Sequence, residues 1–390
     1  MKIRVEPSLA AIDAAQWDAC AKDGLSPETA TGVNPFVSHA FLLALEASGC
    51  TGARAGWSPA HVLVEDAEGT LQAAAPCYLK THSQGEYVFD HSFAEALERA
   101  GGRYYPKLQI SAPFSPVTGP RLLVRAGPVA DTAQTMLIAG LRALCQKTEA
   151  SSIHLTFATE REWHLLGERG FLQRIDQQFH WQNAGYASFE SFLGTLASRK
   201  RKNIRKERKT ALENGISIEW LRGKDILPAH WDAFFAFYTD TSNRKWGRPY
   251  LNRRFFAEIG QSMANQILLI LAKRDGRYIA GAINFIGGDV LYGRNWGCIE
   301  DHPCLHFEVC YYQAIDYAIA NGLIRVEAGA QGEHKLARGY MPVTTYSLHD
   351  FADSRLKNAV ADYLEREREH VSRAGKILAA EGPYKQVAQD

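Results

Sequence analysis

The stretch that decides the fold is QILLILAKRDGRYIAGAINFIGGDVLYGRNWGCIEDHPCLHFEVCYYQAIDYAIANGLIRVEA, residues 266–328. It opens with three apolar runs that are joined by short turns rich in glycine and aspartate. Turns of this length connect neighbouring antiparallel strands, so the stretch predicts a three-stranded meander. The expected strands are 266–273, 278–286 and 290–296.

The second half of the same stretch predicts a crossover back to the sheet. A helix at about 305–321 is closed by Gly322, a residue typical of a helix end. The apolar run 323–328 then reads as a buried strand. Three antiparallel strands, a helix and a further strand indicate a mixed α/β domain.

The flanking sequence supplies enough further elements for a second domain. At 390 residues the chain exceeds the size at which one core stops growing, so we expect two domains, 1–186 and 187–390. The second should include a basic helix at 199–214 and a C-terminal helix at 353–380, in which Leu356, Val360 and Leu364 share a face. The other expected strands are 2–6, 61–65, 71–80, 152–157, 171–181 and 216–221, and the other expected helices are 12–20, 35–47, 131–147 and two within 228–263.

Composition excludes several classes of protein. The net charge of +1 argues against whole-protein attraction to DNA or to an acidic membrane. The N-terminus lacks the apolar core of a signal peptide, and no apolar run approaches the length of a transmembrane segment. The seven cysteines form no CxxC pair, which favours reduced thiols and a cytoplasmic location.

The loop after strand 323–328 is the main candidate for chemistry. Residues 329–340 read GAQGEHKLARGY, in which glycines allow close backbone approach to a ligand. Glu333 and His334 are candidate proton acceptors, and Lys335 and Arg338 are candidate anion-binding groups. The alternative is an ordinary charged surface loop.

Two further candidates lie at the start of helix 305–321. His306 and Glu308 are possible bases for an attacking amine, although Glu308 also fits a carboxylate that stabilises a helix start. Tyr292 is expected to line the wall of the same site. The nearby cysteines and histidines match no common zinc spacing, so we expect no metal.

The first half contributes candidates from three aromatic, polar and proline-rich segments, 89–92, 104–109 and 113–120, which we expect to be loops. We expect Asp90, His91, Tyr105 and Lys107 to bind substrate, whereas the alternative is a set of rigid turns with packed tyrosines. The basic run RKRKNIRKERK at 199–209 contains Arg201 and Arg205 as candidate ligands for a phosphate-rich group or a tRNA end. A solvated helix face is the alternative for that run.

Five segments together resemble one family. They are HSQGEYVFDHSF (82–93), YYPKLQ (104–109), PFSPVTG (113–119), LHFEVCYYQ (305–313) and EAGAQGEHKLARGY (327–340). The chain resembles the FemABX-like branch of the GCN5-related N-acyltransferase (GNAT) superfamily, in the bacterial group of predicted N-acyltransferases and peptidoglycan-biosynthesis-like proteins. The resemblance runs nearly from end to end.

The resemblance implies two tandem GNAT-like domains, each with a mixed, mainly antiparallel sheet flanked by helices, and a C-terminal helix. It implies transfer of an acyl or aminoacyl group to a small-molecule or peptide amine in a cleft between the domains. The donor that the resemblance implies is acyl-CoA or aminoacyl-tRNA, with no tightly bound cofactor. The basic run is similar to the basic segment of Fem proteins. The alternative function is a non-catalytic module that recognises a peptide, a nucleotide-linked precursor or a tRNA acceptor end.

Overall fold

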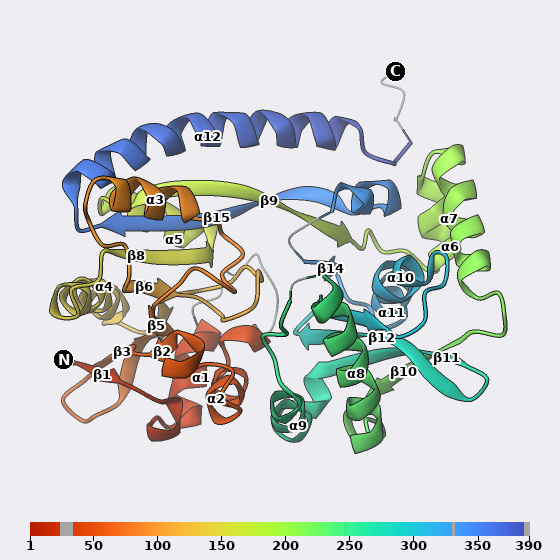
Figure 1. Cartoon of the computed structure of the whole chain (residues 1–390), viewed down its shortest axis with the longest axis horizontal. Coiled ribbons are helices and arrows are strands. Elements are labelled where there is room, and N and C mark those ends of the chain that lie inside the picture. Colours follow the sequence, from red (N-terminus) through yellow and green to blue (C-terminus); the bar gives the residue numbers. More distant parts are fainter. Residues whose placement is uncertain (24–33, 246, 330–331, 386–390) are drawn as a thin grey trace. The chain divides into compact units, whose positions relative to one another are not determined.

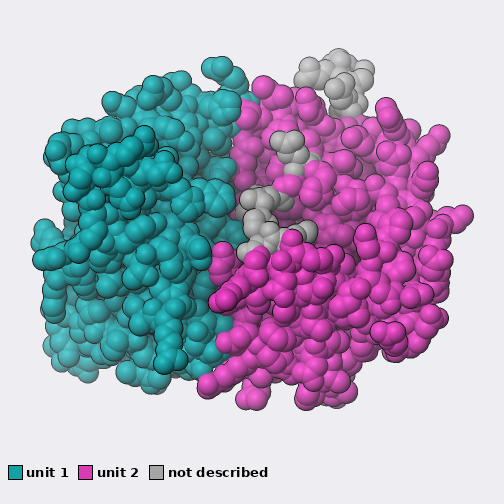
Figure 2. All heavy atoms as spheres, in the orientation of Figure 1, with its two compact units in different colours: residues 1–176, 344–373 teal, residues 177–343, 374–390 magenta. Residues whose placement is uncertain are grey.

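The structure is a computed structural model that describes residues 1–23, 34–245, 247–329 and 332–385 (Figure 1). The chain divides into two compact units, which Figure 2 colours separately. Unit 1 comprises residues 1–176 and 344–373, and unit 2 comprises residues 177–343 and 374–390. Each unit is therefore built from two chain segments, whereas the division predicted from the sequence, 1–186 and 187–390, cuts the chain only once.

The strands of unit 1 form two groups. One has the order β1-β3-β4-β7, and the other has the order β15-β8-β6-β5-β2, in which β6 and β8 pair parallel. β15 pairs antiparallel with β8, and this pairing brings the C-terminal segment into unit 1. The strands are β1 (Lys2–Glu6), β2 (Trp57–Pro59), β3 (His61–Glu65), β4 (Leu71–Ala75), β5 (Cys77–Lys80), β6 (Lys107–Ile110), β7 (Leu123–Val124), β8 (Ser152–Ala158) and most of β15 (Met341–Phe351).

Helices cover these sheets with their apolar faces. Leu137 and Leu141 of α4 share a buried core with Val62, Leu108 and Ile153 of the strands. The predicted apolar face of the C-terminal helix is confirmed, because Leu356, Val360 and Leu364 are buried against Phe93 and Tyr104. The helices are α1 (Ala14–Asp23), α2 (His39–Ala47), α3 (His91–Arg99), α4 (Ala130–Lys147), α5 (Glu160–Glu168) and α12 (Ser354–Ala380), the last of which ends in unit 2.

Two sequence predictions for unit 1 are wrong. The single strand expected at 71–80 is broken at Pro76, since proline has no N–H for the ladder; β4 pairs with β3, and β5 pairs with β2 and β6. The segments around 89–92 and 104–109 were expected to be loops. They instead begin α3 and contain most of β6, a short strand whose four residues are all buried.

The strands of unit 2 confirm the predicted meander. β11, β12 and β13 are antiparallel neighbours, and β14 returns parallel to β13 after the crossover helices, in the order β10-β11-β12-β13-β14-β9. The strands are β9 (Leu172–Gln182), which begins in unit 1, β10 (Ser217–Arg222), β11 (Ile267–Arg274), β12 (Arg277–Gly287), β13 (Val290–Cys298) and β14 (Arg325–Glu327).

The helices of unit 2 pack on this sheet around one core. Ile204 of α7 and Val309, Tyr312 and Ile315 of the crossover are buried in it together with Leu268 of β11. The basic helix ends at Ala211 rather than at residue 214, because Asn214 and Gly215 have positive φ. The helices are α6 (Phe189–Thr195), α7 (Ser198–Ala211), α8 (Pro228–Lys245), α9 (Arg253–Ser262), α10 (Leu305–Phe307) and α11 (Gln313–Ala320).

Candidate active site

The candidate site lies in unit 2, where the chain leaves β14. β14 pairs with β13 from Val290↔Arg325 to Tyr292↔Glu327, while β13 itself continues to Cys298. After β14 the chain forms a short 3₁₀ helix, Glu333–Arg338, within the loop predicted to bind ligand. Loops at the carboxyl ends of parallel strands are common ligand sites in α/β proteins. The topology therefore puts this loop where a ligand site is expected.

An aromatic–histidine cluster, defined as Trp296, His306, Phe307, Tyr311 and His334, lies beside this 3₁₀ helix. The ring centroids of His306 and His334 are 6.3 Å apart, and Tyr311 lies 5.4 Å from the first and 5.7 Å from the second. The Tyr311 hydroxyl is 2.9 Å from Nε2 of His334. Two of the four predicted catalytic residues are thus brought together, with a tyrosine that the sequence analysis did not select.

Gly332 is required next to His334. Its φ of 115° lies in a region that L-residues rarely adopt, and a Cβ there would lie 2.4 Å from Cε1 of the His334 ring. The imidazole of His334 therefore packs directly against the backbone of Gly332. Any side chain at residue 332 would displace it.

Lys335 is the buried cation of the site. It is 2% exposed, and its Nζ donates to the carbonyl oxygen of Gly329 over 2.9 Å. Burial lowers the pKa of Lys335 to about 8; the thiol of Cys310 opposes this shift and the charge of Arg294 adds to it. The ammonium form prevails at neutral pH, but its proton leaves at little cost.

Arg338 holds the 3₁₀ helix in place from within the protein. Its NH2 group donates to both carboxylate oxygens of Glu207 on α7 at 2.9 Å, and NH1 donates to the backbone oxygen of His334 at 2.7 Å. The guanidinium also lies 3.5 Å from the centroid of Phe307. Glu207 accepts a further short hydrogen bond from Tyr312. These contacts make Arg338 a positioning residue for His334.

Glu308 is engaged in a buried ion pair. It has no exposed surface, and Arg208 of α7 donates to its two oxygens at 2.9 and 3.2 Å while Gln313 donates at 2.7 Å. Burial raises the pKa of Glu308 despite the opposing charge of Arg208. Arg208 also donates to Asp316 at 2.6 Å. Glu308 therefore anchors the crossover helix to α7.

The crossover helix contains a widened turn. Residues Glu308–Tyr312 are π-helical, so the backbone N–H of Gln313 donates to the carbonyl of Glu308 five residues earlier. The same spacing brings their side chains into contact. Cys304, just before α10, has a φ of 64°, which is strained for a cysteine. Single π-turns occur frequently at functional sites, and this one carries Tyr311.

Two other predicted residues of unit 2 contribute less. The side chain of Glu333 lies outside the described residues, so its predicted role stays a prediction. Tyr292 is 4% exposed on β13, and burial raises its pKa. It lies opposite Glu327 in the parallel pairing and belongs to the wall of the sheet.

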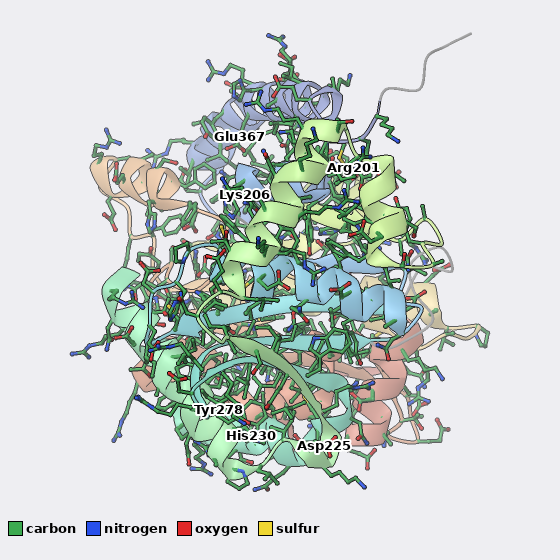
Figure 3. All side chains as sticks on the ribbon, turned by 90° about the vertical axis from the view of Figure 1, so that its right-hand side faces the viewer. Arg201, Lys206, Asp225, His230, Tyr278 and Glu367 are labelled. Carbon is green, nitrogen blue, oxygen red and sulfur yellow. The ribbon has the colours of Figure 1, made fainter. Side chains whose placement is uncertain are left out.

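The basic run forms α7, which carries the labelled Arg201 and Lys206 in Figure 3. Arg205 donates to the exposed Glu190 at 2.5 Å, and Arg201 donates to Ser198 at 3.3 Å. Within the described part of the chain, no acidic partner is recorded for five other cations of this helix. They are Arg199, Lys200, Lys202, Lys206 and Lys209.

The predicted residues of the first half lie in unit 1, around a buried charge cluster of Lys80, Glu86, Asp90 and Lys107. Nζ of Lys107 donates to Glu86 at 2.7 Å and also to Asp90. Burial lowers the pKa of Lys80 to about 7, and its Nζ lies 3.5 Å from the centroid of Trp57. Burial also acts to lower the pKa of Lys107, but the two carboxylates raise it further than burial lowers it.

Tyr105 and His91 differ in their relation to this cluster. The Tyr105 hydroxyl is 2.8 Å from Oγ of Ser83, which in turn accepts from Lys107 at 2.9 Å. His91 begins α3, is exposed, and stacks on Phe89 with centroids 6.2 Å apart. Of the four predicted residues in this half, three therefore share one network and His91 does not.

A histidine pair extends the same network. Nδ1 of His154 and Nδ1 of His349 are 2.6 Å apart, so only one of these two atoms can carry a proton while the bond stands. Nε2 of His154 lies 2.7 Å from Oγ of Ser152 and 3.3 Å from the hydroxyl of Tyr104, which donates to Asp90. Burial lowers the pKa of His154 to about 3 and lowers that of His349 well below its usual value.

Sequence reasoning missed several residues that hold these sites together. Glu207 and Arg208 lie within a run judged by its overall charge, and their partners are more than 90 residues away in sequence. Tyr311 lies within the segment 305–313, but no role was predicted for it. Glu86 lies within the segment 82–93 but was not selected, and only the register of β5 with β6 places Lys80 opposite Lys107.

Two features are absent from the described residues. No group of three or more histidine, cysteine, aspartate or glutamate side chains there has the arrangement of a metal site. No helix there is both long enough and apolar enough to cross a membrane.

Comparison with known proteins places the chain in a family. A family model for FemAB-like proteins, described as peptidoglycan biosynthesis/recognition, matches residues 8–386. No curated protein matches the chain. Among solved structures, FemX is similar with a TM-score of 0.55 and 12% identity, over 93% of this chain and 100% of its own.

Two other solved structures share the fold. The C-terminal DUF2156 domain of a protein from Agrobacterium fabrum gives a TM-score of 0.54 at 9% identity, over 91% of this chain and 96% of its own. L-PGS from Bacillus licheniformis gives 0.51 at 9% identity, over 87% and 98%. At such identities the likeness shows the fold alone, whereas the family model spans nearly the whole sequence. The chain therefore belongs to the FemAB-like family of peptidoglycan biosynthesis/recognition proteins.

Proposed function

We propose that this protein is an N-acyltransferase that moves an acyl or aminoacyl group onto an amine at the loop after β14. The observation that carries the proposal is the arrangement of Lys335, His334 and Tyr311. A buried amine with a pKa of about 8 lies one residue from a histidine that a tyrosine holds. Amide formation needs a cation for the developing oxyanion and an acceptor for the proton of the attacking amine, and these residues supply both.

The proposed reaction begins with a neutral amine attacking the carbonyl carbon of a thioester or ester donor. The new C–N bond forms, and the negative charge on the carbonyl oxygen is stabilised by the ammonium of Lys335. The amine gives its proton to Nδ1 of His334. When the carbon–sulfur or carbon–oxygen bond of the donor breaks, that proton passes to the leaving thiolate or alkoxide.

This role of His334 requires one tautomer. Nδ1 is a base only when Nε2 carries the proton, and Nε2–H then donates to the Tyr311 hydroxyl 2.9 Å away. Arg338 supports this arrangement because it binds the backbone oxygen of His334. His306, 6.3 Å from His334, faces the same space and is a second candidate for contact with the amine.

The donor we propose is acyl-CoA or aminoacyl-tRNA, and the acceptor is a small-molecule or peptide amine. The cations of α7 that have no recorded acidic partner support a donor that carries phosphates. No step of the proposed reaction calls for a tightly bound cofactor. The predicted cleft between the two domains stays a prediction.

The proposal is tested by measuring turnover with both donor classes. One arm follows thiol release from a panel of acyl-CoAs, and the other follows loss of radiolabelled amino acid from charged tRNA. Each arm is supplied with amino acids and UDP-linked muropeptides as acceptors. Lys335→Ala should abolish turnover with the productive donor, and Lys273→Ala on β11 is the matched control that should retain it.

Two results would refute the proposal. The first is the absence of turnover and of any ligand-induced rise in melting temperature with every donor. The second is unchanged turnover in both Lys335→Ala and His334→Ala. Binding of charged tRNA without turnover, lost at high salt, would favour the alternative of a recognition module.

A further inference from the structure

Among the described residues, one edge strand of the sheet in unit 2 is β10. β10 pairs with β11 and is the terminal strand in the recorded order. In Figure 3 it leads to the labelled Asp225, on the side of the molecule that faces the viewer. The free edge of such a strand offers backbone N–H and C=O groups that can pair with another strand.

The edge is apolar on one face. A shallow groove of about 490 Å³ is lined by Leu212, Ile216, Ile218 and Trp220, with Ser217 and Gln313. Trp220 and Leu212 are each 40% exposed. Exposed indole and leucine side chains beside a free strand edge are typical of an interaction surface.

Trp220 is held in one orientation. Its Nε1 donates to Oε1 of Gln313 at 2.7 Å, and its ring meets Tyr317 edge-on with centroids 5.3 Å apart. A side chain that is already fixed loses little conformational entropy on binding. The surface is thus prepared for a partner.

The acidic residue of the strand is neutralised within its own chain. Glu219 points to the opposite face, where it accepts hydrogen bonds from Lys273 at 3.2 Å and from Tyr278 at 2.9 Å. Tyr278 also lies 3.2 Å from His230, and both are labelled in Figure 3. Glu219 therefore does not oppose an uncharged partner strand.

We propose that β10 is a homodimer interface in which two copies pair antiparallel about a two-fold axis through Trp220. A two-fold axis perpendicular to the sheet does not exchange the two faces of the sheet. Residues directly opposite each other in an antiparallel pair point to the same face, so one residue must lie directly opposite its own copy, and the pairing is centred on that residue. Only centring on Glu219 or Trp220 pairs five of the six residues of β10 with a second copy.

The side chains decide between these two registers. Centring on Glu219 places two carboxylates directly opposite each other, which is destabilising. Centring on Trp220 places the two indoles opposite each other, Ile218 opposite Arg222 of the other copy, and Glu219 opposite Leu221. Aromatic pairs stabilise such contacts, and no like charges meet.

The interface is small, because one short strand and its groove supply it. We therefore expect a dissociation constant in the micromolar range, on the order of 1–100 μM, rather than an obligate dimer. The inference does not depend on the proposed transferase activity. It concerns residues that have no part in that chemistry.

Sedimentation velocity of the full chain between about 1 and 200 μM tests the proposal. The wild type should shift from one to two times 43.4 kDa with concentration. Trp220→Glu should weaken association at least about 30-fold, since an aromatic anchor is lost and two carboxylates then face each other. Leu227→Glu, at an apolar residue that is 54% exposed outside β10, is the control that should leave association unchanged.

A charge-complementation experiment fixes the register. Trp220→Glu and Trp220→Lys should each associate more weakly than the wild type, while an equimolar mixture should associate more tightly than either alone because residue 220 of one copy faces residue 220 of the other. Far-UV circular dichroism confirms that each variant is folded. A wild type that stays monomeric at 200 μM, a Trp220→Glu variant that associates as tightly as the wild type, or a folded mixture that associates no more tightly than either variant alone would each overturn the proposal.

Discussion

Acidification from about pH 6.5 to pH 5 should destabilise unit 1 through the buried pair His154 and His349. Both pKa values lie far below the usual value of about 6.5 that the unfolded chain retains. The stabilisation from neutral, buried imidazoles is therefore present above pH 6.5 and is lost as the pH falls toward the folded pKa, about 3 for His154. Over this pH range the unfolded state binds protons at these histidines, whereas the folded state does not.

The size of the effect follows from this difference in proton uptake. An unfolded imidazole is half-protonated at pH 6.5, so His154, which a folded pKa of about 3 keeps neutral, lowers the free energy of unfolding by roughly 1.6 kcal/mol by pH 5, and His349 adds a loss of the same sign. Urea denaturation at several pH values, followed by circular dichroism and tryptophan fluorescence, measures this loss. His349→Asn keeps a donor near Nδ1 and removes one titrating group, so its loss over the same range should be smaller than that of the wild type.

The difference between variant and wild type isolates the pair from other groups that titrate in this range. His164→Asn, at an exposed residue on α5 of the same unit, is the matched control and should keep the wild-type pH dependence. The reasoning fails if His349→Asn loses as much stability between pH 6.5 and pH 5 as the wild type does. It also fails if the wild type shows no loss over that range.

Three further predictions concern single charged groups. Lys107→Met should lower the free energy of unfolding by about 3–5 kcal/mol, since it leaves the buried Asp90 without its cation and Glu86 with Lys80 at 3.5 Å, and a loss below about 1 kcal/mol in urea denaturation would contradict this. Glu207→Gln should cost about 1–3 kcal/mol and speed amide hydrogen exchange around residues 333–338, because Arg338 loses its carboxylate; unchanged exchange there would count against that role. Arg294→Gln should raise the pKa of Lys335 above about 8 in an NMR titration of labelled lysine, and an unchanged or lowered value would contradict the effect assigned to Arg294.

The fold of unit 2 was predictable because its signals are local. The turns at 273–277 and 287–289 are short and polar, and the strands between them are strongly apolar. The widened turn at Glu308–Tyr312 was not predictable, since its residues fit an ordinary helix and only one hydrogen-bond step differs. A further strand after the crossover helix was expected, and the structure shows that this strand, β14, pairs parallel with β13.

The short elements of unit 1 escaped prediction for a different reason. β6 reads KLQI, and a lysine and a glutamine in four residues do not indicate a buried strand. Both are buried all the same, because Lys107 pairs with carboxylates and Gln109 donates to Thr156 at 2.8 Å. Polar residues that are buried because distant residues bind them cannot be recognised from the local pattern of polar and apolar residues.

The candidate site was predicted in part. The glycine-rich loop, His334 and Lys335 were selected from their types and their place after a strand, and His306 was selected from its place at a helix start. The partners that hold them could not be selected in this way, because Glu207 lies 131 residues from Arg338 and no spacing rule links the two. The family resemblance marks segments, whereas the contacts distinguish the residues within them.

The two-segment construction of unit 1 affects how the protein folds while it is being made. β8 acquires β15 as its neighbour only after residues 344–351 have been synthesised, and the helix that covers Phe93 follows them. At typical rates of translation, the ribosome needs roughly 10–40 s to go from the end of the first segment of unit 1 to the end of its second. During that time one edge of β8 is open to wrong partners, so the nascent chain should be a substrate for chaperones that shield strand edges.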